Sequence, residues 1–118
     1  MQDQPRIKTA LPKRRYQIGD YAATVLGEIE ADDGRDYRWL MAFVPMGKTE
    51  PSLYVCCEPA PAERRADGNW DIRIVSKAMT DILDTADHWG DLDTFCEQAI
   101  DLARQVLGLA SQEAFRLS

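Results

Sequence analysis

The alternation of apolar and polar residues is clearest between Leu92 and Leu107, where it has the period of an α-helix. Six apolar residues recur every three or four positions, and polar residues fill the other side. The apolar set is Leu92, Phe95, Ala99, Leu102, Val106 and Leu109. Asp91 or Asp93 is a suitable N-cap, Thr94 and Glu97 have capping-box spacing, and Gly108 suits the position after the last turn. The pattern predicts one amphipathic helix.

Before this helix, the pattern changes to the two-residue period of β-strands. We expect strands at about 21–30, 37–44, 52–58 and 70–76, with a short lead-in at 16–18. Asp33 and Gly34 favour a hairpin turn. In the fourth strand, Trp70, Ile72 and Ile74 are predicted to face inward and Asp71 and Arg73 outward. Residues 78–90 fit a strand extension, a helical turn or an acidic connector, and residues 109–118 fit a further short helical turn.

This element order predicts an α+β fold: a four-stranded antiparallel meander with the C-terminal helix packed on one face. One helix cannot cover both faces of a sheet, yet the face opposite the predicted core is also apolar. Its residues are Leu26, Leu40, Ala42, Val44, Tyr54, Cys56 and Val75. An exposed patch of this kind favours a twofold homodimer. The alternative is that the N-terminal arm or the C-terminal tail folds over this face.

Length and charge predict one domain preceded by a basic N-terminal arm. The chain has 118 residues and a net charge of −6, and we expect a single domain over 16–118 after a mobile basic arm at 1–15. Residues 80–101 hold seven acidic side chains and no Lys or Arg. No apolar run is long enough to span a membrane, and no secretory signal opens the sequence, so we expect a cytoplasmic protein.

Candidate chemistry is sparse. His88 is the one histidine; with Asp87 and Trp89 it is a candidate for a ligand or partner surface, although a lone histidine before a helix is more typical of a surface or capping role. The acidic residues of 80–101 lack the frame of a calcium loop, so no metal and no cofactor is expected. Cys56, Cys57 and Cys96 are expected to be reduced and buried, and Cys96 has the better position for a reactive thiol because it lies in the first helical turn.

The aromatic strand residues and the basic arm suggest a third function, nucleic-acid binding. The order of four strands and a helix resembles that of the single-stranded-DNA-binding transcriptional coactivators, although no motif is shared. Exposed aromatics on strands can stack bases, and Lys13, Arg14 and Arg15 could contact phosphate. The acidic body of the chain repels phosphate, which makes this function the least favoured.

No catalytic constellation is present in the sequence. We therefore expect a small non-catalytic protein that acts through protein contacts, above all with itself. Leu40, Val44 and Tyr54 are candidates for the partner surface. The alternative is small-molecule binding or catalysis in a pocket between sheet and helix, or between two copies.

Overall fold

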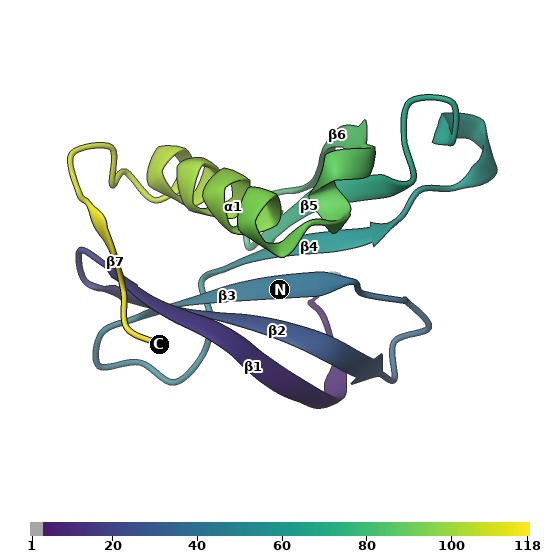
Figure 1. Cartoon of the computed structure of the whole chain (residues 1–118). Coiled ribbons are helices and arrows are strands. Elements are labelled where there is room, and N and C mark those ends of the chain that lie inside the picture. Colours follow the sequence, from purple (N-terminus) through teal and green to yellow (C-terminus); the bar gives the residue numbers. More distant parts are fainter. Residues whose placement is uncertain (1–3) are drawn as a thin grey trace.

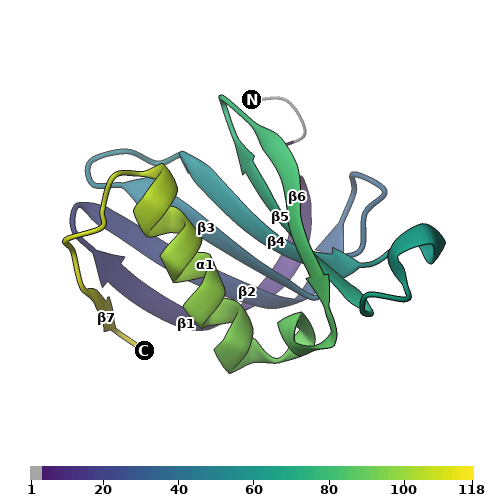
Figure 2. The same cartoon turned by 90° about the horizontal axis from the view of Figure 1, so that it is seen from above.

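Seven strands form one antiparallel sheet across the part of the chain that the structure, a computed structural model, describes, which is residues 4–118. The order is β6-β5-β4-β3-β2-β1-β7, so consecutive strands are neighbours from β1 to β6, and β7 returns to the outer side of β1. One helix, α1, lies across one face of this sheet (Figures 1 and 2). The bounds are β1 Ile7–Ile18, β2 Tyr21–Ala31, β3 Trp39–Pro45, β4 Leu53–Pro59, β5 Trp70–Ser76, β6 Thr80–Ala86, α1 Leu92–Val106 and β7 Ala114–Arg116, with 3₁₀ turns η1 Ala62–Arg64 and η2 Asp87–Gly90. The α+β class and the antiparallel meander are confirmed, and the number of four strands is wrong.

The four expected strands correspond to β2, β3, β4 and β5, and the fourth has the predicted bounds. Their inward residues form the main core, with Val25, Phe43, Val55 and Ile74 fully buried beneath the helix. Alternation was a dependable signal here because one face of each strand packs on α1.

The expected arm at 1–15 is instead mostly strand, since β1 begins at Ile7 and the predicted lead-in at 16–18 is its end. Its polar side chains pair with carboxylates on β2 rather than facing water alone. Lys8 Nζ lies 3.4 Å from Glu30 Oε1, and Lys13 Nζ lies 2.6 Å from Glu28 Oε2. A strand stabilised by cross-strand charge pairs shows little apolar alternation, which explains why the sequence did not reveal it. The expected mobility of residues 1–3 falls outside the described residues.

The two remaining strands lie at the edges of the sheet. Of the segment 78–90, for which the sequence allows three alternatives, residues 80–86 form β6 as a separate strand paired with β5, and residues 87–90 form the turn η2. The expected helical turn after residue 109 is wrong, because Ala114–Arg116 forms β7 beside β1. β6 is mostly exposed and β7 is only three residues long. Neither carries the apolar alternation by which strands are recognised.

The helix was predicted to within one residue. Asp91 is its N-cap, and its side chain accepts a hydrogen bond from the Thr94 backbone at 3.0 Å. Gly108 follows the last turn with a φ of 70°, as expected for a position that favours glycine. The buried face of α1 consists of Phe95, Cys96, Ala99, Ile100 and Ala103. No helix in residues 4–118 has the length and apolar content needed to cross a bilayer.

The second face of the sheet is covered by the chain itself. Leu40, Tyr54, Cys56 and Val75 are buried there, and Leu26, Ala42 and Val44 are half-buried. Ile7, Ile29 and Ala31 pack against this second cluster, where the far ends of β1 and β2 pair with each other. Pro5 is also buried, and Gln4 Nε2 donates to Tyr54 Oη at 3.1 Å. The alternative of coverage by the N-terminal part of the chain therefore matches the burial of these residues.

Candidate functional site

A cleft of about 570 Å³ opens where α1 passes over β1 and the end of β7. Its described lining comes from all three elements, and most of it is polar. The residues are Arg14 and Tyr16 on β1, Asp93, Cys96, Glu97, Ile100, Asp101 and Arg104 on α1, and Ala114 on β7. Of the sites proposed from the sequence, this one corresponds to the pocket between sheet and helix.

The periodicities of the two elements place these side chains together. On α1, positions 93, 97, 101 and 104 are three or four residues apart and share one side of the helix. On β1, Arg14 and Tyr16 are two residues apart and point to the same face of the sheet. Tyr16 belongs to the main core, and Arg14 extends from the same face to the helix.

Two ion pairs set the charge of the cleft. Arg14 pairs with Asp93 and also donates to Tyr16 Oη at 3.4 Å. The hydrogen bond that Arg14 donates to Asp93 raises the pKa of Arg14 above its ordinary value, so this guanidinium stays charged. Arg104 Nη1 lies 3.7 Å from Asp101 Oδ1. Within the described part of the chain, Glu97 forms no ion pair, so three carboxylates and two guanidiniums leave the cleft with one negative charge.

One donor in the cleft has no acceptor. The Nε of Arg104 is buried and forms no hydrogen bond to any residue in 4–118. Buried polar atoms are nearly always hydrogen-bonded in folded proteins. The cleft therefore contains a buried donor without an acceptor and, on the same side of α1, a carboxylate without an ion pair.

The thiol and the phenol of the cleft are not activated for catalysis. Cys96 is 1% exposed, and burial raises the pKa of its thiol above the ordinary value, only partly opposed by Tyr16 and Arg14. Burial likewise raises the pKa of Tyr16. Both groups keep their protons at neutral pH, and a neutral thiol is a poor nucleophile. The arrangement suits binding better than nucleophilic chemistry, and the helical position of Cys96 does not lead to a reactive thiol.

The structure separates the three basic residues of the expected arm. Arg14 lines the cleft, whereas Lys13 pairs with Glu28 and the side chain of Arg15 is exposed. β1 has a register shift between Pro12 and Arg14, which interrupts the regular alternation at Lys13. In this arrangement Lys13 and Arg14 each pair with a carboxylate, and Arg15 forms no ion pair within residues 4–118.

Asp87, His88 and Trp89 form η2, outside the cleft lining. Trp89 is buried, and its backbone oxygen accepts a hydrogen bond from Cys57 Sγ at 3.2 Å. Asp87 Oδ1 accepts from the Asn69 backbone at 2.9 Å, while His88 is exposed with its ring 4.2 Å from that of Trp89. These contacts fix the turn that leads into α1.

The aromatic strand residues also contact η2 or its end. Trp39 Nε1 donates to the Gly90 oxygen at 3.0 Å, and the Arg38 guanidinium lies over the rings of Trp39 and Trp70. On the second face, Tyr37 and Tyr54 are buried, as is Leu40, and Val44 is half-buried. These side chains support the fold, and none of them forms an open stacking platform or a large exposed patch.

Sequence reasoning missed most of the cleft. The prediction that polar residues fill the solvated side of the helix is right for Glu97 and Asp101, which are exposed, but it does not reveal that they line a cleft. Tyr16 is predicted only as part of a short lead-in strand. The missing signal was the contact between Arg14 and Asp93, which are 79 residues apart. No group of three or more metal-ligating side chains occurs in residues 4–118. Comparisons with protein-family models, with curated proteins and with solved structures gave no match.

Proposed function

We propose that this protein binds a small molecule bearing a positively charged amine in the cleft between α1 and β1. The observation that carries the proposal is the unpaired carboxylate of Glu97 in a cleft where the other charges are already paired. The volume of about 570 Å³ falls within the range of small-molecule sites, roughly 300–1,000 Å³.

The other residues of the cleft indicate which further chemical groups the ligand would carry. Ile100 and Ala114 supply a small apolar wall, and Arg104 Nε is a donor that needs an acceptor. A ligand that combines an ammonium group with a carbonyl or hydroxyl oxygen would satisfy both polar groups. Asp93, Glu97 and Asp101 give the helix side of the cleft three carboxylates, which favour the approach of a cation.

The test compares a probe with an ammonium group and a neutral relative in which that nitrogen is acetylated. Glycinamide carries an ammonium group and a carbonyl oxygen, and N-acetylglycinamide keeps the carbonyl but has no charge. In a ¹⁵N-labelled sample, glycinamide is expected to shift the amide signals of Glu97, Ile100 and Arg104 saturably. Substituting Glu97→Gln removes the charge and should weaken glycinamide binding by about tenfold or more, the effect of one charge-assisted hydrogen bond.

Glu63→Gln is the matched control, since Glu63 is an exposed carboxylate on η1, outside the cleft. It should bind glycinamide as the unmodified protein does. Equal binding of both probes, or equal affinity of Glu97→Gln and Glu63→Gln for glycinamide, would remove the proposal.

Action through protein contacts, the function that the sequence favoured most, stays a prediction. Its main support was an apolar second face, and those residues are buried or half-buried in the single chain. Three of the exposed large hydrophobic residues do lie at the β5–β6 turn and on β6, namely Met79, Ile82 and Leu83. β6 also carries Asp81 and Asp84 and a register shift, features that protect an edge strand from pairing with another chain. The cleft is therefore the better-supported site.

A further inference from the structure

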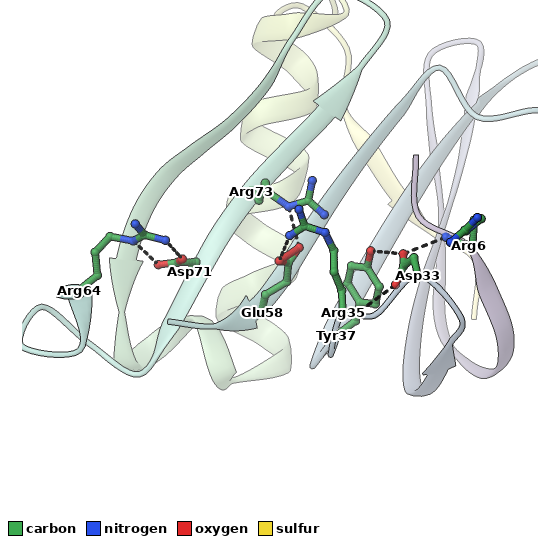
Figure 3. A network of polar contacts seen from close by, with 8 residues as sticks. All are labelled: Arg6, Asp33, Arg35, Tyr37, Glu58, Arg64, Asp71 and Arg73. Atoms are coloured by element: carbon green, nitrogen blue, oxygen red, sulfur yellow. Dashed lines mark hydrogen bonds and ion pairs between the residues drawn. The ribbon is translucent and has the colours of Figure 1, made fainter. Parts of the chain in front are cut away.

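On the second face of the sheet, β5 buries an arginine whose terminal nitrogens have no partner. The side chain of Arg73 is 4% exposed, and its Nε donates to Glu58 Oε1 at 2.6 Å. Its Nη1 and Nη2 are buried and form no hydrogen bond with any residue in 4–118. Together these two nitrogens carry four N–H donors. Figure 3 shows them pointing away from Glu58.

The neighbouring carboxylates already have donors of their own (Figure 3). Glu58 Oε2 accepts from Arg35 Nη1 at 3.0 Å. Asp71 accepts from Arg64 at 2.6 Å and from Thr85 at 2.5 Å. Across the sheet, the hydroxyl of Tyr37 donates to Asp33 at 2.7 Å. Each of these carboxylates thus already accepts hydrogen bonds from other residues, and the terminal nitrogens of Arg73 have no acceptor.

The charges are also unequal, because Arg35 and Arg73 share the single carboxylate of Glu58. This cluster of three residues carries one net positive charge. It lies beside the apolar residues Tyr54, Cys56 and Val75, where an uncompensated charge is unfavourable. One further negative charge would neutralise it.

We infer that Arg73 and Arg35 form a binding site for the carboxylate group of a small molecule. A carboxylate matches the unpartnered Nη1–Nη2 edge of Arg73 in shape, because its two oxygens can accept two parallel hydrogen bonds. It also supplies the single negative charge that the cluster lacks. Arg35 connects the buried cluster to the surface, since it contacts Glu58 and its side chain is 43% exposed. This site lies on the face of the sheet opposite α1, so it is independent of the cleft.

The test uses sodium acetate as the probe and sodium chloride at equal ionic strength as the reference. With the full chain labelled with ¹⁵N, acetate is expected to shift the Nε–H signal of Arg73 saturably, and chloride is not. Arg35→Gln should weaken acetate binding by about tenfold, because it removes one charged donor from the site. Arg116→Gln, which alters an exposed arginine on β7, should leave acetate binding unchanged.

A merely structural role of Arg35 would move amide signals in Arg35→Gln without changing the acetate concentration at half-saturation. That result would overturn the inference, as would equal effects of acetate and chloride. Saturable binding of inorganic phosphate without binding of acetate would also overturn it, because the site is assigned to a carboxylate. None of these outcomes depends on the cleft, so the two proposals can fail separately.

Discussion

Replacing Phe95 with alanine is expected to lower the free energy of unfolding by about 3–5 kcal/mol, the usual effect of removing a fully buried phenylalanine. Phe95 is 0% exposed and lies where α1 packs on the core of the sheet. Its removal takes away apolar contacts and leaves a cavity that the sheet cannot fill. Urea unfolding followed by circular dichroism measures the change.

Phe115→Ala is the matched control, because Phe115 is 59% exposed on β7. The same chemical change there should alter the free energy of unfolding by less than about 1 kcal/mol. If both variants lost the same stability, the packing of α1 on the sheet described above would be wrong.

Glu58→Gln is expected to be comparably severe, at about 3–5 kcal/mol, the loss typical when one partner of a buried ion pair is removed. Arg73 is almost completely buried and has its single described acceptor in Glu58. Glutamine keeps the size of the side chain but removes the negative charge shared by Arg73 and Arg35. Urea unfolding at neutral pH measures this loss.

Glu30→Gln provides the comparison, since Glu30 pairs with Lys8 while its side chain is 63% exposed. An exposed ion pair contributes little, so this variant should change the free energy of unfolding by less than about 1 kcal/mol. A loss for Glu58→Gln no greater than that for Glu30→Gln would contradict the description of the cluster as a buried charge centre.

The comparison of sequence and structure shows which interactions leave a local pattern. The helix and β2–β5 could be predicted because their apolar residues repeat with a clear period on a buried face. β1 was not predicted because Lys8 and Lys13 pair with carboxylates on β2. The strand is therefore rich in charged residues, a composition that is also typical of a mobile arm. For β6 the sequence leaves strand, helical turn and connector open, because this strand is largely exposed at the sheet edge and has no apolar alternation.

The same reasoning explains what was missed at the candidate sites. Arg14 was noted for its charge, but its place in the cleft depends on a contact with Asp93 that no local window contains. Arg73 and Asp71 were predicted to face outward, and they do lie opposite the main core. Both are nevertheless buried: Asp71 accepts hydrogen bonds from Arg64 and Thr85, and Arg73 donates to Glu58. The alternation of apolar and polar residues predicts which face of the sheet a side chain lies on. Whether that side chain is buried depends on the other residues that pack over it.

Thiol labelling tests most directly whether one chain covers both faces of its own sheet. Cys56 faces the second cluster and Cys57, the next residue, faces the main core; both are free and 0% exposed. The native protein would be treated with N-ethylmaleimide over a wide dilution series, and each cysteine read by mass spectrometry. The account predicts that Cys56 stays as unreactive as Cys57 at every protein concentration. Labelling of Cys56 that appears on dilution, while Cys57 stays protected, would show that a partner covers the second face and would contradict the account.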